Sequence, residues 1–276
     1  MNNRLPQLDH SLFVTDAGLE TVMIFEKGVH LPEFASFVML EDALQTEILR
    51  QYYEQYVAIA QKYSAGVILE SPTWRANKDW GEKIGYSESS LTAVNEQAIA
   101  LLQSIRGDRK TLLPIVISGC IGPRGDGYKP DSQMDVDTAT QYHMPQIDTF
   151  KAAGADMVGA MTLTYPEEAI GIVRAAKTLN IPVSISFTVE TDGRLPCGQS
   201  LRSAIEQVDK ATNSGPAYYT INCAHPTHFQ SALTGESWTD RIYGIRANAS
   251  RKSHAELDES ETLDEGNPQE LGSEYA

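Results

Sequence analysis

The sequence predicts one α/β domain over residues 1–276, with the architecture of a (β/α)8 TIM-type barrel that lacks its eighth strand and helix. Short apolar runs rich in β-branched residues alternate with longer helical patterns, which indicates a parallel sheet buried on both faces. The length suits a barrel, and no low-complexity linker divides the chain. After Ser250 the sequence is polar and acidic, so we expect the domain to be incomplete at its C-terminal side.

The strands and helices follow from these runs in order. The apolar runs that predict strands are 12–15, 66–70, 113–118, 156–160, 183–187, 217–222 and 242–247. The helical patterns are 44–63, 91–105, 138–153, 167–179 and 201–212, with a short turn at 229–233. In the first helix, five residues repeat at helical spacing and share one face: Leu49, Tyr52, Tyr56, Ile59 and Ala60. Without an eighth strand the barrel has an open edge beside its first strand, which predicts low stability or self-association.

Composition excludes several classes of function. The formal net charge of −15 argues against nucleic acid or an anionic membrane as a partner, because both bind basic surfaces. No apolar run approaches the length of a membrane-spanning helix, and the N-terminus lacks the apolar core of a signal peptide. We therefore expect a cytoplasmic protein. The acidic stretch 256–274 is predicted to be a solvated tail or helix face.

Cysteine usage points away from disulfides and from a local zinc motif. The chain has three cysteines, Cys120, Cys197 and Cys223, and no C-x-x-C pair. The spacing Cys223, His225, His228 can be interpreted as a local metal cluster, but Pro226 restrains the turn, and ordinary loop histidines are the simpler interpretation. Any metal ligands must then converge from distant strands.

Polar residues follow the apolar runs, where a parallel barrel places its active site. Asp16 and Glu70 can bind an ammonium group or serve as acid and base, or they can simply accept hydrogen bonds from neighbouring backbone. Cys223 can be a soft-metal ligand, a nucleophile or a buried structural cysteine. The glycine-rich loop 122–127 can cradle a phosphate, although it matches no phosphate-binding pattern.

Three segments in order resemble homocysteine S-methyltransferases. Residues 117–125 (ISGCIGPRG) resemble the family's third strand, and 185–189 (ISFTV) with 192–195 (DGRL) resemble the fifth. Residues 221–226 (INCAHP) resemble the sixth-strand segment that carries the first zinc cysteine. The resemblance implies a zinc-bound homocysteine thiolate that takes a methyl group from a sulfonium or ammonium donor, giving methionine.

The resemblance also implies roles for particular residues. Cys223 matches the first zinc ligand and is the implied catalytic and metal-binding residue. The implied substrate-binding residues are Asp16, Glu70, Thr73, Asn222 and Asn248.

The chain departs from the family pattern at three places. The segment with the other two zinc cysteines is absent, Glu20 replaces a glycine, and Met161 replaces a substrate-binding glutamate. One thiolate does not make a tight zinc site unless Cys120 or Cys197 approaches it, so the expected zinc site is incomplete. Three hypotheses remain: a methyltransferase represented by a truncated chain, a non-catalytic or metal-free protein that binds a small amino acid, and a metal-free barrel enzyme that uses Asp16 and Glu70. The donor is open among S-methylmethionine, S-adenosylmethionine and betaine.

Overall fold

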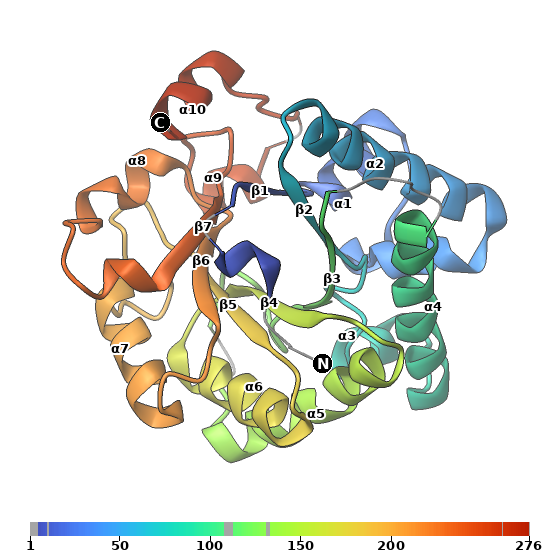
Figure 1. Ribbon diagram of the computed structural model, residues 1–276, viewed down its shortest axis with the longest axis horizontal. Coiled ribbons are helices and arrows are strands. Elements are labelled where there is room, and N and C mark those ends of the chain that lie inside the picture. The colour runs from blue at the N-terminus through green and yellow to red at the C-terminus, as the bar shows by residue number, and fades with distance from the viewer. Residues whose placement is uncertain (1–4, 10, 108–112, 131–132, 261, 276) are drawn as a thin grey trace. The chain divides into compact units, whose positions relative to one another are not determined.

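The computed structural model describes residues 5–9, 11–107, 113–130, 133–260 and 262–275 (Figure 1). The chain forms two compact units. The first consists of residues 1–122, 144–159 and 179–182, and the second of residues 123–143, 160–178 and 183–276. The prediction of a single domain stays a prediction.

Seven strands follow one another in one sheet in the order of the chain, β1 to β7. Their bounds are β1 Phe13–Thr15, β2 Gly66–Glu70, β3 Ile115–Ile121, β4 Met157–Leu163, β5 Val183–Phe187, β6 Tyr218–Asn222 and β7 Ile242–Arg246. This order, with helices between the strands, confirms the predicted fold class, a (β/α)8-type arrangement. Among the described residues no eighth strand follows β7.

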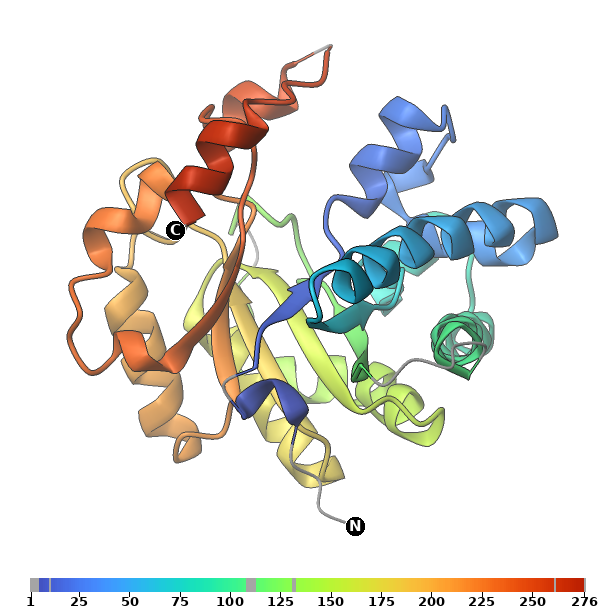
Figure 2. The same ribbon diagram turned by 45° about the horizontal axis from the view of Figure 1, so that its top comes forward.

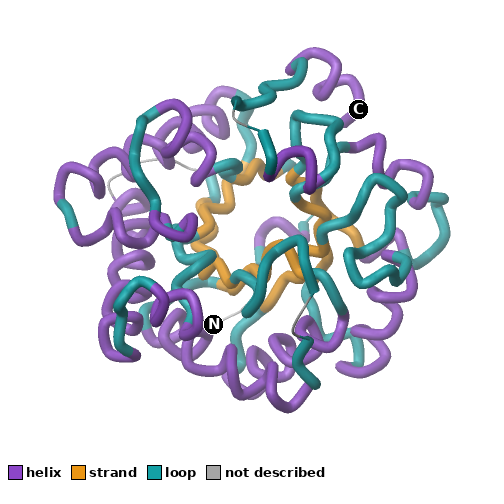
Figure 3. Tube along the Cα trace, turned by 180° about the vertical axis from the view of Figure 1, so that it is seen from behind, coloured by secondary structure: helices purple, strands orange, loops and turns teal. Residues whose placement is uncertain are grey.

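Helices connect the strands, and in each unit they pack against one face of them (Figure 3). The longer helices are α2 Ala43–Lys62, α4 Glu88–Gly107, α5 Val136–Ala152, α6 Pro166–Leu179 and α7 Leu201–Thr212. The shorter ones are α1 Leu19–Thr21, α3 Lys78–Lys83, α8 Pro226–Phe229, α9 His254–Asp258 and α10 Pro268–Tyr275. Single helical turns are η1 Pro6–Leu8, η2 Val22–Glu26, η3 Pro32–Phe34, η4 Ser36–Glu41, η5 Gln230–Ala232 and η6 Thr239–Arg241.

In the first unit, β1, β2 and β3 pair in parallel, with Val14 opposite Val67 and Ile68 opposite Val116. Every residue of β2 and β3 is buried, as expected for strands covered on both faces. Helix α2 begins where the Asp42 carboxylate accepts a hydrogen bond from the Gln45 N–H at 2.8 Å. It packs on β2, while α4 packs on β3.

In the second unit, β5, β6 and β7 pair in parallel, with Phe187 opposite Ile221. The rings of Phe187 and Tyr219 stack with centroids 6.3 Å apart. Helix α7 has the predicted bounds, because the Ser200 side chain caps its N-terminus and Asn213 ends it in the left-handed conformation (φ 53°).

The acidic stretch 256–274, predicted to be a solvated tail or helix face, includes most of helix α10, in which no residue is buried. Helix α10 lies beside α8 in the second unit (Figure 2). The Tyr275 hydroxyl accepts a hydrogen bond from the Ala247 N–H at 2.8 Å and lies 3.4 Å from the Ile245 carbonyl oxygen, so it satisfies backbone groups at β7. The side chain of Glu274 is only 19% exposed. These contacts join residues about thirty positions apart in the chain, which composition does not show.

Strand β3 also extends beyond the predicted run, which ended at Ser118. Gly119 and Cys120 lie inside β3 instead of in the loop that follows it, and Cys120 is buried. Gly119 fits there because a Cβ at this position would lie 2.4 Å from the Phe150 ring. Within the described residues, no helix has the length and apolar character needed to cross a membrane.

Candidate functional site

Asp16 lies directly after β1 in the first unit and is 2% exposed. Its Oδ1 accepts a hydrogen bond from the Glu70 N–H at 2.8 Å, and the Tyr52 hydroxyl lies 3.4 Å from its Oδ2. The carboxylate therefore holds the end of β2 against the end of β1. This is the structural role that the sequence left open beside ligand binding, and it places Asp16 and Glu70 together.

Glu70 is the last residue of β2 and is buried. A Cβ at Gly159 in β4 would lie 2.8 and 2.9 Å from the two carboxylate oxygens, so glycine leaves the space that this carboxylate occupies. The Glu70 carbonyl accepts a hydrogen bond from the Tyr53 hydroxyl at 2.8 Å. Burial, reinforced by the charge of Asp16, raises the pKa of Tyr53 well above its usual value, so this hydroxyl stays a neutral donor.

Thr73 lies in the loop after β2 and is fully buried. Its hydroxyl donates to the Cys120 carbonyl at 2.8 Å and lies 2.6 Å from the Ser71 hydroxyl. Thr73 thus ties this loop to β3.

The second unit holds the other predicted site residues. Asn222 ends β6 and is buried. Its Oδ1 accepts hydrogen bonds from the Thr162 N–H at 2.9 Å and the Ser186 hydroxyl at 2.6 Å. Its Nδ2 donates to the Thr162 hydroxyl at 2.8 Å and to the Cys223 Sγ at 3.2 Å. The amide of Asn222 therefore joins β4 and β5 to the cysteine.

Cys223 is half-buried and has a left-handed backbone, with φ 55°. Residues other than glycine seldom adopt this conformation, so the neighbouring contacts must hold it. The Cys223 N–H donates to the Arg246 carbonyl at 3.1 Å, and the Asn248 Nδ2 donates to the Cys223 carbonyl at 3.1 Å. The structure thus brings Asn222, Cys223 and Asn248 together, with polar neighbours around the thiol.

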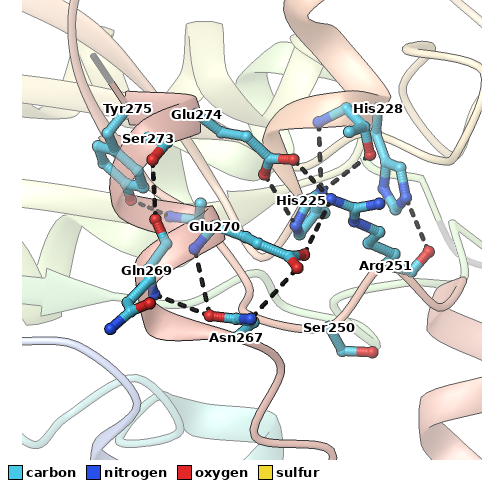
Figure 4. Close-up of polar contacts among 12 residues, drawn as sticks. His225, His228, Ser250, Arg251, Asn267, Gln269, Glu270, Ser273, Glu274 and Tyr275 are labelled. Atoms are coloured by element: carbon cyan, nitrogen blue, oxygen red, sulfur yellow. Dashed lines mark hydrogen bonds and ion pairs between the residues drawn. The ribbon is translucent and has the colours of Figure 1, made fainter.

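The two nearby histidines have partners other than the thiol. His225 Nδ1 lies 2.8 Å from the Thr227 hydroxyl, and its Nε2 lies 3.1 Å from Glu274 Oε2 (Figure 4). Burial lowers the pKa of His225, and the charge of Glu274 opposes part of that shift. His228 Nε2 donates to the Arg251 carbonyl at 3.0 Å. These contacts favour ordinary structural histidines over a local metal cluster.

The donor set does not fit a metal ion held by three protein side chains. Within the part of the chain that the structure describes, no three His, Cys, Asp or Glu side chains are grouped to hold an ion. Among the described residues of the second unit, Cys197 therefore does not join Cys223 in a group of three such ligands.

The departures from the family pattern have local partners. Glu20 accepts a hydrogen bond from the Ser36 hydroxyl at 2.7 Å. The Met161 sulfur lies 3.7 Å from Arg246 Nη1, a weak contact at the position where the resemblance leads us to expect a glutamate.

Sequence reasoning missed the residues that hold Cys223 in place. Thr162 and Ser186 bind Asn222, and His254 Nε2 lies 2.6 Å from the Cys223 carbonyl oxygen. His254 follows the last predicted strand, in the polar and acidic sequence after Ser250, which gives no sign of a site residue. Its one local signal is the pair Ser253 and Glu256, which forms a capping box at the start of α9.

Comparisons with known proteins bear on the fold and on the family. The homocysteine methyltransferase MmuM from Escherichia coli has a similar fold in three crystal structures. The metallated form gives a TM-score of 0.70 at 18% identity, over 93% of this chain and 98% of that chain. The oxidized form gives 0.69 at 18% identity, over 91% and 95%. The apo form gives 0.63 at 17% identity, over 93% and 97%.

No curated protein matches the sequence. The profile of the homocysteine S-methyltransferase family matches residues 13–273, which include both units and every candidate site residue. This chain therefore belongs to the homocysteine S-methyltransferase family, whose members are methyltransferase enzymes.

Proposed function

We propose that this protein transfers a methyl group to the sulfur of homocysteine, giving methionine. The observation that carries the proposal is the constrained Cys223 in a chain of this family. A half-buried thiol at the end of a parallel strand, held in a left-handed conformation and hydrogen-bonded by Asn222, is placed as functional residues are in this type of fold.

The reaction is a displacement at carbon. The homocysteine thiol gives up its proton to water, and its sulfur attacks the methyl carbon of a sulfonium or ammonium donor. A new S–C bond forms as the bond from the methyl carbon to the donor breaks, and that electron pair stays on the donor's sulfur or nitrogen. The positive charge of the donor is thereby neutralised, so no further co-reactant is needed.

The chain's residues support this reaction by binding and orientation. Asp16 presents its carboxylate directly after β1, and we assign it the amino group of homocysteine. Glu70 and Thr73 line the same end of β2 and its loop. We assign Asn222 and Asn248 mainly to the positioning of Cys223, because their side-chain amides bind its sulfur and its carbonyl.

A metal-free binding protein is the second candidate function. It is favoured by the same observation that argues against zinc: the described residues offer no group of three ligands. Zinc in proteins is held by three or four side chains, so Cys223 alone would bind it weakly. In this alternative the protein binds homocysteine or a related small amino acid without turning it over.

The experiment is methyl transfer to homocysteine from S-methylmethionine, S-adenosylmethionine or betaine, each labelled with 13C in the methyl group. Each donor is tested with added zinc and with a chelator. We expect labelled methionine from at least one donor with the wild type and the Cys197→Ala control, and a rate at least about a hundred-fold lower for Cys223→Ala. Homocysteine binding with no transfer from any donor would support the binding protein instead.

Elemental analysis of the purified chain tests the metal separately. We expect much less than one zinc per chain. Stoichiometric zinc would contradict the conclusion that the ligand set is incomplete. We propose the cytoplasm as the compartment, with the thiol substrate and the methyl donor as small-molecule partners and without nucleic acid or membrane partners, in keeping with the net charge of −15.

A further inference from the structure

His254 lies where four separate segments of the second unit meet. The residue is 6% exposed and begins α9, after β7. Its ring stacks on Tyr128, from the loop after β3, with centroids 4.1 Å apart. Its Nδ1 lies 3.2 Å from Glu190 Oε1, in the loop after β5. Its Nε2 lies 2.6 Å from the carbonyl oxygen of Cys223, after β6.

The contact with Cys223 has a defined direction. A carbonyl oxygen carries no hydrogen, so Nε2 must donate to it. Glu190 and Tyr128 hold the other side and the face of the ring, which fixes the direction of this donor. A donor that two other contacts hold in place loses little freedom when it binds its acceptor.

This carbonyl is part of the peptide bond that follows Cys223, the residue with the left-handed backbone. His254 and Asn248 both donate to it, at 2.6 and 3.1 Å, while the Cys223 N–H is bound to the Arg246 carbonyl. The backbone is therefore held on both sides of the cysteine. This hold keeps the thiol within reach of the Asn222 amide at 3.2 Å.

We propose that His254 is a positioning residue, which holds the Cys223 peptide in its left-handed conformation so that the thiol faces the site. The inference rests on the proposed role of Cys223 in methyl transfer. Removal of the Nε2–H donor of His254 should then disturb the Cys223 peptide more than removal of the aromatic ring does. A residue that only filled space would behave in the opposite way.

Two substitutions separate these properties. His254→Phe keeps an aromatic ring to stack on Tyr128 but has no donor, and His254→Gln keeps an N–H donor on a flexible chain without the ring. His228→Ala is the matched control, because this histidine also donates to a backbone carbonyl, that of Arg251, but does not touch Cys223.

The primary measurement is hydrogen–deuterium exchange of peptides that cover 221–226 and 246–250, which needs neither metal nor substrate. We expect His254→Phe to raise the exchange rate of the Cys223 and Asn248 amides about ten-fold, with distant peptides unchanged, because one strong hydrogen bond is lost. In His254→Gln the exchange rates of these amides should stay within about three-fold of the wild-type rates, and in His228→Ala they should equal the wild-type rates. Wild-type exchange rates of the Cys223 and Asn248 amides in His254→Phe would overturn the inference. Faster exchange of these amides in His254→Gln than in His254→Phe would also overturn it.

Methyl transfer gives the second readout. We expect His254→Phe to lower kcat at least about ten-fold with the KM for homocysteine little changed, and His254→Gln to recover most of kcat. Faster exchange with unchanged kcat would overturn the functional part of the inference. If the wild type transfers no methyl group, the proposed function fails, while the exchange rates still decide whether His254 holds the Cys223 peptide.

Discussion

Substitution of Asp16 separates its structural role from its proposed role in binding. The carboxylate accepts the N–H of Glu70, a buried residue, at 2.8 Å. Asp16→Ala leaves that N–H without its acceptor. Asp16→Asn keeps an oxygen at the same position but removes the negative charge. The two variants therefore differ in the hydrogen bond, while both lose the charge that would pair with the amino group of homocysteine.

The structure sets the size of the two effects. An unsatisfied buried N–H costs about 1–3 kcal/mol, so we expect Asp16→Ala to lower the free energy of unfolding by about 2 kcal/mol. Exchange of a charged acceptor for a neutral one costs about 1 kcal/mol or less. For a chain of this size, 1 kcal/mol corresponds to roughly 2–4 °C in Tm. The Tm should therefore fall by about 4–8 °C in Asp16→Ala and by roughly half as much or less in Asp16→Asn.

Thermal unfolding followed by circular dichroism measures the stability, and titration calorimetry measures homocysteine binding. Asp148→Asn is the control, because it removes a carboxylate from an exposed position on α5. We expect homocysteine binding to weaken at least about ten-fold in both Asp16 variants and to be unchanged in the control. Equal losses of Tm in Asp16→Ala and Asp16→Asn would refute the hydrogen-bond argument. Wild-type affinity in Asp16→Asn would refute the binding role.

Three further predictions concern the fold and its pH dependence. Gly122→Ala should lower the free energy of unfolding in urea by about 3 kcal/mol, because the new Cβ would lie 2.1 Å from the Trp74 carbonyl oxygen. In the control, Gly125→Ala, the new Cβ meets no atom within 4 Å, so this free energy should stay within about 0.5 kcal/mol of the wild-type value. Tyr275→Phe should lower the free energy of unfolding by about 1 kcal/mol and increase self-association in sedimentation velocity, because the Tyr275 hydroxyl binds backbone groups at the end of β7. Unchanged stability and unchanged association would contradict this. The folded pKa of Tyr53 is raised by burial, so its contribution to stability is present below about pH 10 and is lost as the pH rises further. Tm should therefore fall less between pH 9 and 11 in Tyr53→Phe, and an equal fall would contradict the assignment.

Much of the fold could be predicted because local sequence and burial agree. Helix α7 begins after Ser200 and ends before Asn213 as predicted, since both ends have capping residues that the sequence displays. Strands β2 and β5 have their predicted bounds, and every residue in them is buried, as expected for strands covered on both faces. Cys120 was misplaced by contrast, since a glycine beside it suggested a loop, whereas the Phe150 ring fills the space that Gly119 leaves.

For the candidate site, the sequence indicates which residues lie near one another better than it indicates their contacts. Cys223, Asn222 and Asn248 were found through the resemblance, and the structure brings them together. The sequence does not show which way an amide points, and the substrate-binding role that the resemblance implies for both asparagines stays a prediction. His254 was missed because its partner lies 31 residues away and nothing local to α9 indicates the contact. Distant hydrogen bonds of this kind depend on the folded backbone.

The most direct test of the account is a single-turnover measurement of methionine formation by the purified chain. The protein, in excess over homocysteine, is mixed with the donor that proves active, and the wild type is compared with Cys223→Ala and Cys197→Ala. The account predicts methionine from the wild type and from Cys197→Ala, with almost none from Cys223→Ala. Equal methionine formation by Cys223→Ala, or no methionine from the wild type with any of the three donors, would contradict it.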